Sequence, residues 1–204
     1  NPLGITTDGT NLYVSDYHNH RIRKIVISSG VVTTLAGSGT ATFANGTDTS
    51  ASFQYPTGIE TDGTNLFVAD RNNHRIRKIV ISTGVVTTIA GSGDYAFANG
   101  TGTSASFKYP TGITFDGTNL YVVDRYSSTI RKIALMKTES VDVALHNLDD
   151  DADVTVAVSS SDTGEASVSP ATLTFTEANR NTAQTVTVTG VDDNNSDGHQ
   201  DYDI

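Results

Sequence analysis

Residues 56–91 read PTGIETDGTNLFVADRNNHRIRKIVISTGVVTTIAG, and nearly the same pattern stands at residues 2–37. The period is 54 residues, because residues 4–57 and 58–111 are identical at 42 of 54 positions and a third copy begins at Gly112. A period of this length indicates a repeat architecture, in which each unit forms one small sheet that buries its faces against its neighbours.

Each unit is predicted to contain four short strands. In the first copy, β-branched residues and an alternation of period two place these strands at residues 4–7, 12–15, 21–27 and 31–36. Clusters of Asp, Gly, Asn and Ser separate them and are typical of turns. A longer connection, residues 40–55, leads to the next copy. Four antiparallel strands followed by a connection to an equivalent unit predict a β-propeller blade.

Four motifs, at residues 56–59 (PTGI), 65–70 (NLFVAD), 72–79 (NNHRIRKI) and 87–91 (TTIAG), resemble the NHL repeat. Asn73-His74-Arg75 stands where the family has its Asn-His-Leu-type signature. The resemblance covers residues 1–133 and implies a propeller, in a family whose closed rings often have six blades. We therefore expect three NHL-type blades starting at residues 4, 58 and 112, the last one incomplete, with the remaining blades of the same propeller as partners.

The charge balance changes near Ala134. Residues 1–134 carry nine acidic and eleven basic residues, whereas residues 135–204 carry fourteen acidic and two basic ones. This asymmetry predicts two modules, 1–134 and 135–204. The absence of cysteine excludes a disulfide framework and a thiolate metal site. No apolar run approaches the roughly 18 residues of a membrane span, and the sequence contains no signal-peptide pattern.

Residues 135–204 are predicted to form an incomplete antiparallel β-sandwich, which makes the whole chain all-β. Apolar residues alternate in four segments, 141–145, 154–158, 173–175 and 186–188. The segments 153–156, 159–162, 168–170, 173–176 and 184–193 resemble the Calx-β-like sandwich of large bacterial surface proteins. This resemblance implies an extracellular or bacterial cell-surface location and a truncated sandwich between about residues 140 and 204.

The Calx-β resemblance also implies Ca²⁺ as a ligand of acidic loops. Carboxylate and amide oxygens at alternate positions before a glycine are the ligands that Ca²⁺ favours. His199 stands where the family usually has an acid, and the alternative is that the acidic module only promotes solubility. The candidate ligands are Asp192, Asp193, Asn195, Asp197 and Asp201.

Three sets of residues return at the same position of successive copies: Asp16, Asp70 and Asp124; His20 and His74; and Arg23, Arg77 and Arg131. An aspartate at the end of the second strand is predicted to bond the amides of the turn or to pair with the following arginine. The basic runs 21–24 and 75–78 form either a basic row, which some NHL propellers use to bind RNA, or a solvated strand face. The absence of interleaved aromatic residues and the low net charge argue against nucleic acid.

The histidines do not recur as a catalytic set would. His18 becomes Asn72 and Tyr126 in the later copies, and His20 becomes Ser128 in the third. Metal binding needs three or more convergent ligands, and no nucleophile–base arrangement is visible. We therefore predict a non-enzymatic protein, with a lyase or hydrolase whose active site lies in blades outside this chain as the alternative.

The differences between the first two copies lie mostly in the connections. Loops on a rigid frame commonly carry binding function, although drift after duplication produces the same pattern. The sequence thus predicts an interaction scaffold for protein or carbohydrate partners, with the sandwich as a spacer and an RNA-binding propeller as a further alternative. The candidate contact residues are Tyr17, His18, Arg71, Asn72, Asp94, Tyr95, Arg125 and Tyr126.

Overall fold

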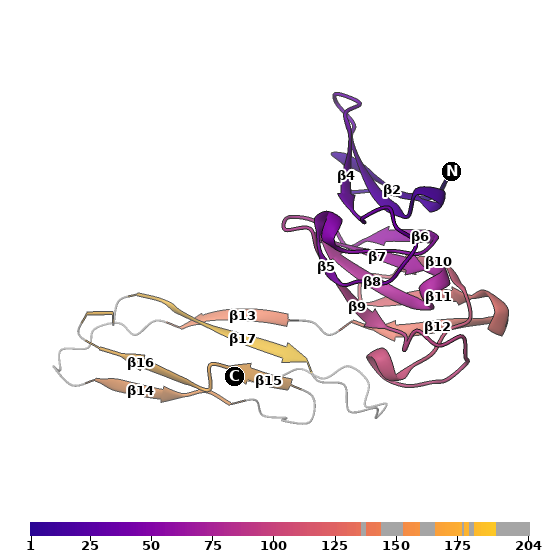
Figure 1. The fold of residues 1–204 in the computed structure, drawn as a ribbon. Coiled ribbons are helices and arrows are strands. Elements are labelled where there is room, and N and C mark those ends of the chain that lie inside the picture. The colour runs from indigo at the N-terminus through magenta and orange to yellow at the C-terminus, as the bar shows by residue number, and fades with distance from the viewer. Residues whose placement is uncertain (136–137, 144–152, 160–165, 177, 180–181, 191–204) are drawn as a thin grey trace. The chain divides into compact units, whose positions relative to one another are not determined.

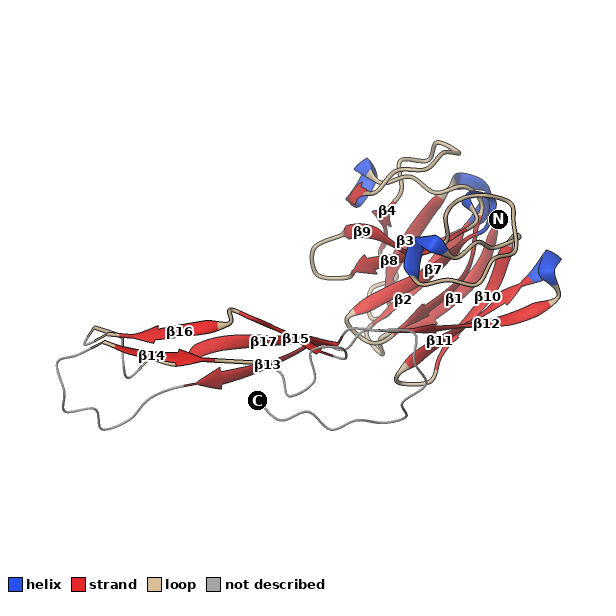
Figure 2. Ribbon diagram, turned by 90° about the horizontal axis from the view of Figure 1, so that it is seen from below, coloured by secondary structure: helices blue, strands red, loops and turns tan. Residues whose placement is uncertain are grey.

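The computed structural model describes residues 1–135, 138–143, 153–159, 166–176, 178–179 and 182–190. These residues form strands and single-turn 3-10 helices, with no α-helix in the described ranges (Figure 2). The all-β prediction is therefore confirmed. The chain divides into two compact units, Asn1–Leu135 and Met136–Ile204.

The first blade is an antiparallel sheet in the order β1-β2-β3-β4. Its turn between β1 and β2 closes on Asp8, whose Oδ1 accepts the N–H groups of Thr10 at 2.8 Å and Asn11 at 2.6 Å. Asp62 and Asp116 make the same two contacts in the later copies, so the repeated DGTN sequence sets the same tight turn each time. The bounds are β1 (Pro2–Thr7), β2 (Asn11–Asp16), η1 (Tyr17–Asn19), β3 (Arg21–Val26) and β4 (Val32–Ala36).

The second blade has one strand more than the sequence predicts. Two residues of the incoming connection, β5 (Gly46–Thr47), pair antiparallel with the outer strand β9 and give the order β5-β9-β8-β7-β6. The connection therefore contributes a strand to the sheet of the blade that follows it. The other bounds are η2 (Asp48–Ser50), β6 (Pro56–Thr61), β7 (Asn65–Asp70), η3 (Arg71–Asn73), β8 (Arg75–Val80) and β9 (Val85–Ala90).

The third blade has three strands in the order β10-β11-β12, as expected from the point at which the repeat stops. Its bounds are η4 (Gly102–Ser104), β10 (Pro110–Phe115), β11 (Asn119–Asp124), η5 (Arg125–Ser127) and β12 (Thr129–Ala134). The three sheets of the first unit lie one on the next in chain order (Figure 1).

The first strands of successive blades approach each other closely. β6 lies against both β1 and β10, and the Thr57 hydroxyl donates to the carbonyl oxygens of Pro110 at 3.3 Å and Thr111 at 3.2 Å. A Cβ atom at Gly4 would overlap the carbonyl oxygen of Thr57, and one at Gly58 would overlap that of Thr111. Glycine stands at these positions because only a residue without a side chain lets the backbones meet.

The hydrophobic core of the first unit lies between the blades rather than within them. One cluster joins the first two blades and a second joins the last two, and each receives a fully buried phenylalanine, Phe53 or Phe107, from a connection. Burial of a whole aromatic ring contributes roughly 1.5–3 kcal/mol. The connections therefore hold neighbouring blades together.

The second unit contains two antiparallel sheets, β13-β17-β15 and β14-β16. Val158, Leu173, Phe175 and Val186 form one buried cluster, to which both sheets contribute, as in a sandwich. β15 was not among the predicted alternating segments, because Val168 is its only large apolar residue. Val168 packs against that cluster. The bounds are β13 (Thr138–Val143), β14 (Val154–Ala157), β15 (Ala166–Ser169), β16 (Thr172–Phe175) and β17 (Gln184–Gly190).

Candidate binding face

A buried ion pair links β7 to β8 in the second blade. Asp70 Oδ2 lies 2.8 Å from Arg77 Nη1, and neither side chain has any exposed surface. The Asn73 amide donates to the same carboxylate oxygen at 2.8 Å. Charged groups taken out of water are tolerated when they are paired and hydrogen-bonded in this way.

The same pair holds the connection that arrives from the first blade. Asp70 Oδ1 accepts the Gln54 N–H at 2.8 Å. Arg77 donates to the carbonyl oxygens of Ser52 at 3.0 Å and Ala44 at 2.7 Å. The repeated aspartate and arginine therefore fix the path of a connection between blades, in addition to orienting their own hairpin.

The environment of Arg77 is aromatic as well as acidic. Its guanidinium carbon lies 4.9 Å from the ring centre of Phe43 and 5.1 Å from that of Phe53. The interpretation of the basic run as a solvated strand face is wrong for Arg77, which is fully buried. Arg75, which directly follows His74, donates instead to the Ser92 carbonyl at 2.6 Å.

Burial also changes the titration of this pair. Loss of water raises the pKa of the Asp70 carboxyl to about 6, and the Arg77 charge and the Asn73 amide oppose that rise. Burial lowers the pKa of Arg77, and the Asp70 charge opposes that change. The carboxylate depends on its partners to remain charged in this site.

The third blade repeats the arrangement with its own incoming connection. Asp124 lies 3.4 Å from Arg131 and accepts the Lys108 N–H at 2.7 Å, while Arg131 donates to the Ser106 carbonyl at 3.0 Å. In the first blade, Asp16 lies 3.5 Å from the amino group of Asn1 instead. The three aspartates thus occupy equivalent places, but only two of them bind a connection.

The repeated histidines link each blade to the next. His20 and His74 adopt positive φ angles of 54° at the ends of η1 and η3. Their Nδ1 atoms accept the backbone N–H groups of Tyr55 at 3.2 Å and Tyr109 at 3.4 Å. An imidazole that accepts a hydrogen bond at Nδ1 must be unprotonated at that nitrogen. These contacts assign both histidines a positioning role.

The contribution of these two histidines to stability should therefore be lost as the pH falls below the ordinary histidine pKa of 6.5. Burial lowers the pKa of His20 and His74, so the folded protein binds fewer protons than the unfolded chain in this range. We expect the double variant His20→Asn/His74→Asn, whose asparagines tolerate positive φ, to lose less thermal stability between pH 7.5 and 5.5. Thermal unfolding followed by circular dichroism measures the difference.

His18→Asn is the matched control for that experiment, because it removes an exposed histidine of the same segment. Asp70 is present in every protein compared, so its own titration cancels in the difference. An identical pH dependence for the wild type and the double variant would contradict the role assigned to His20 and His74.

Tyrosine rings and arginines gather where the second strands end. Tyr17 lies 4.9 Å from Tyr55 between ring centres, and Tyr109 lies 5.3 Å from Tyr95 and 5.2 Å from Tyr126. We call this surface the tyrosine–arginine face. It consists of Tyr17, Tyr55, Arg71, Tyr95, Tyr109, Arg125 and Tyr126.

Arg71, in the second blade, joins the ring pair Tyr17–Tyr55 to the group around Tyr109. Its Nη1 donates to the Tyr17 hydroxyl at 3.3 Å, and its guanidinium carbon lies 4.5 Å from the ring centre of Tyr109. Arg125 lies 5.6 Å from the ring of Tyr126 in the same way. Aromatic and basic residues do not interleave along the sequence, but they do so in the folded chain, because Arg71 contacts Tyr17, 54 positions away, and Tyr109, 38 positions away.

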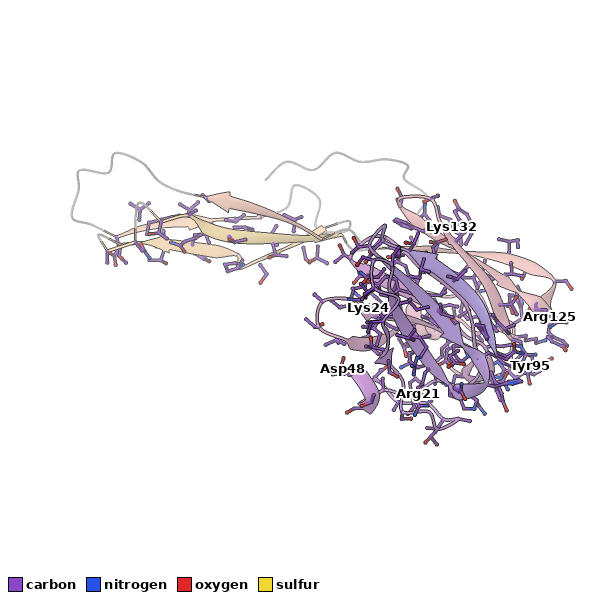
Figure 3. All side chains as sticks on the ribbon, turned by 90° about the horizontal axis from the view of Figure 1, so that it is seen from above. Arg21, Lys24, Asp48, Tyr95, Arg125 and Lys132 are labelled. Carbon is purple, nitrogen blue, oxygen red and sulfur yellow. The ribbon has the colours of Figure 1, made fainter. Side chains whose placement is uncertain are left out.

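The face remains accessible although its rings contact one another. Tyr95 and Tyr126 are 52% and 54% exposed, and Arg125 is exposed as well. Figure 3 shows Tyr95 and Arg125 near each other, and Lys132 apart from both. Large rings held in place at little conformational cost are favourable contact groups for a partner.

Most of the candidate contact residues lie on or beside this face. Tyr17, Arg71, Tyr95, Arg125 and Tyr126 belong to it. His18 stacks on Tyr17 with ring centres 4.9 Å apart, and Asn72 accepts a hydrogen bond from Arg71 at 2.8 Å. The remaining candidate, Asp94, contacts Ser92.

Tyr55 and Tyr109 were not among the predicted contact residues. Both are the same residue in the first two copies, whereas the candidates were chosen because the copies differ there. Their positive φ of 54°, which is uncommon for a residue with a bulky side chain, turns each ring toward the histidine of the preceding blade.

The candidate Ca²⁺ ligands Asp192, Asp193, Asn195, Asp197 and Asp201 lie outside the described residues. Within the described ranges, no group of three or more His, Cys, Asp or Glu side chains is close enough to hold a metal ion. In the same ranges, no helix has the length and apolar character needed to cross a membrane.

Asp70, Asn73 and Arg77, which hold the first connection, fall in one sequence match together with His74. Residues 53–79 match the NHL repeat family. NHL repeat-containing protein 2 of Bos taurus is 40% identical over 91 residues, which make up 42% of this chain and 12% of that protein. Protein SUPPRESSOR OF QUENCHING 1 of Arabidopsis thaliana is 41% identical over 86 residues, 41% of this chain and 8% of that protein. The chain thus spans only a small part of these relatives.

Solved structures support the propeller fold of the first unit. A Bacteroides thetaiotaomicron protein of unknown function is 29% identical, with a TM-score of 0.57 over 61% of this chain and 32% of that one. An auxiliary nutrient binding protein from Bacteroides ovatus is 24% identical, with a TM-score of 0.55 over 62% of this chain and 35% of that one. At that identity the second likeness concerns the fold alone.

Proposed function

We propose that the chain is a non-enzymatic binding protein that presents the tyrosine–arginine face to an acidic carbohydrate partner. The observation that carries this proposal is a cluster of tyrosine rings in which Arg71 joins Tyr17 to Tyr109 across blade boundaries. Tyr95 and Tyr126, which contact Tyr109, are about half exposed. The flat faces of aromatic rings accept the apolar side of a sugar ring, and guanidinium groups bind carboxylate or sulfate in a paired geometry.

The location of the face supports binding rather than catalysis. Its residues stand in 3-10 turns and connections on a rigid frame of strands, which is where binding residues concentrate in repeat proteins. His20 and His74, two of the three histidines that contact the rings, already accept backbone N–H groups through Nδ1. We propose an extracellular or cell-surface setting with the second unit as a Calx-β-like spacer, and Ca²⁺ binding by its acidic loop.

The experiment for this function is an array of neutral, uronic and sulfated oligosaccharides probed with the full chain. We expect binding to acidic members that weakens as salt rises, because exposed charges are screened over about 10 Å at 0.1 M salt. Binding to neutral members alone, or to none, would remove the support for an acidic carbohydrate partner.

Single-stranded RNA is the second candidate, because Arg71 stands between Tyr17 and Tyr109. Rings that alternate with cations are the usual platform for stacked bases. The net charge of the first unit is weak for such a role. A labelled oligonucleotide titrated under the conditions of the array distinguishes the two: tighter binding to RNA than to any acidic oligosaccharide favours the second candidate.

A further inference from the structure

The boundary between the second and third blades carries a tyrosine and a lysine that the first boundary lacks. Tyr95 and Lys108 belong to the connection that joins these two blades, and the equivalent positions of the first connection hold Ala41 and Gln54. The first boundary forms without such side chains, so they are not needed to join two blades. Their role must be sought in what they contact at the surface.

Three tyrosine rings at this boundary each lie beside a cation, in the pairs Tyr95–Lys108, Tyr109–Arg71 and Tyr126–Arg125. The distances from the ring centres to the lysine nitrogen or the guanidinium carbon are 5.6, 4.5 and 5.6 Å. The rings of Tyr95 and Tyr126 lie 5.3 and 5.2 Å from the central ring of Tyr109. We call these six side chains the second-boundary cluster, because they form one continuous set of contacts.

The cations of the second-boundary cluster have no acidic partner. In the residues that the structure describes, none of the three forms a salt bridge with a carboxylate. Arg71 donates to the neutral oxygens of Tyr17 and Asn72 at 3.3 and 2.8 Å. By contrast, Arg77 and Arg131, which hold connections, each pair with an aspartate. The cluster therefore presents positive charge that an anionic ligand can complement.

The first boundary has the same central ring with a different neighbour. Tyr55 stands in the place of Tyr109, and Tyr17 lies 4.9 Å from it between ring centres, where the second boundary has Arg71. Within the described ranges, no lysine or arginine stacks on the ring of Tyr55. The two boundaries should therefore differ in their affinity for an acidic ligand.

We propose that the second-boundary cluster is the main subsite of the tyrosine–arginine face and binds one carboxylated or sulfated sugar unit, an inference that rests on the function proposed above. Tyr95, which is 52% exposed, supplies a flat surface for the apolar side of the sugar ring. Lys108 and Arg71 donate hydrogen bonds to the acidic group. Tyr95 and Lys108 thus set the specificity of the subsite, and each chain binds one such unit there.

The test is isothermal titration of the full chain with tetragalacturonate, which carries carboxylates, and with a heparin tetrasaccharide, which also carries sulfates. We expect one ligand per chain for the probe that binds more tightly. Tyr95→Ala and Lys108→Gln should each weaken its binding by about tenfold. Each variant introduces the residue of the first copy, so the connection is able to fold with it. Only Lys108→Gln should also make the affinity less sensitive to salt, because it removes a charge.

Lys132→Gln is the matched control, because it makes the same change at an exposed lysine apart from Tyr95 (Figure 3). Asp94, the acid next to Tyr95, is present in every protein compared, so its repulsion cancels in the differences. Wild-type affinity in both Tyr95→Ala and Lys108→Gln would overturn the inference and leave the proposed function standing. An equal loss for Lys108→Gln and Lys132→Gln would also overturn it. Absence of binding by the wild-type chain to both probes would overturn the proposed function together with the inference.

Discussion

The full chain carrying Asp70→Ala is expected to lose about 3–5 kcal/mol of its free energy of unfolding, because the substitution leaves Arg77 charged and unpaired in a buried site. Neither side chain of this pair has exposed surface. The Gln54 N–H and the Asn73 amide lose their acceptor at the same time. One change therefore weakens both the second blade and its contact with the incoming connection.

Asp16→Ala is the matched control, since the same aspartate in the first blade is 19% exposed and holds no connection. We expect it to cost less than about 1 kcal/mol, as partly exposed ion pairs do. The chain has no tryptophan and seven of its eight tyrosines lie in the first unit, so tyrosine fluorescence during urea denaturation follows that unit. Equal losses for the two variants would show that burial of the pair is unimportant.

Phe107→Ala is expected to lower the free energy of unfolding by about 3–5 kcal/mol through loss of apolar contacts and formation of a cavity. Phe107 is 1% exposed and packs with Ala69, Ile76 and Val122, which come from two different blades. Removal of its ring should separate the second and third blades before the individual sheets unfold. Hydrogen exchange should show lost protection first along β10–β12.

Phe97→Ala provides the comparison, because both rings lie over the same guanidinium. Arg131 is 4.8 Å from the centre of Phe97 and 4.9 Å from that of Phe107, but Phe97 is 49% exposed. We expect a loss of about 0.5–1 kcal/mol, the usual strength of an exposed cation–π contact. A loss as large as that of Phe107→Ala would mean that stacking on Arg131, rather than burial between blades, stabilises this boundary.

Much of the fold was predictable because the same strand and turn pattern occurs in two full copies and in a third, incomplete one. Alternation and turn residues located the strands of a blade to within two residues at each end. The pairing of Gly46–Thr47 with the next blade was not predictable, since two residues in a glycine-rich connection carry no periodic signal. Nor could spacing show that Asp70 pairs with Arg77 rather than Arg75, because the choice depends on which arginine faces the incoming connection.

The candidate binding face was predictable in part. Variation between copies pointed to Tyr17, Arg71 and Tyr126, but the invariant Tyr55 and Tyr109 gave no such signal. Aromatic and basic residues alternate only after the blades stack, since each contact joins different parts of the chain. A linear reading of composition cannot detect a surface built in this way.

The measurement that tests the central claim most directly compares Arg125→Ser with Lys132→Ser for binding of the full chain to the acidic oligosaccharide selected on the array. Each variant removes one exposed charge from the third blade, and the two side chains lie apart from each other on that blade (Figure 3). If the tyrosine–arginine face is the binding surface, Arg125→Ser weakens binding by about tenfold and Lys132→Ser leaves it unchanged. Equal effects of the two variants, or a larger effect of Lys132→Ser, would contradict the account.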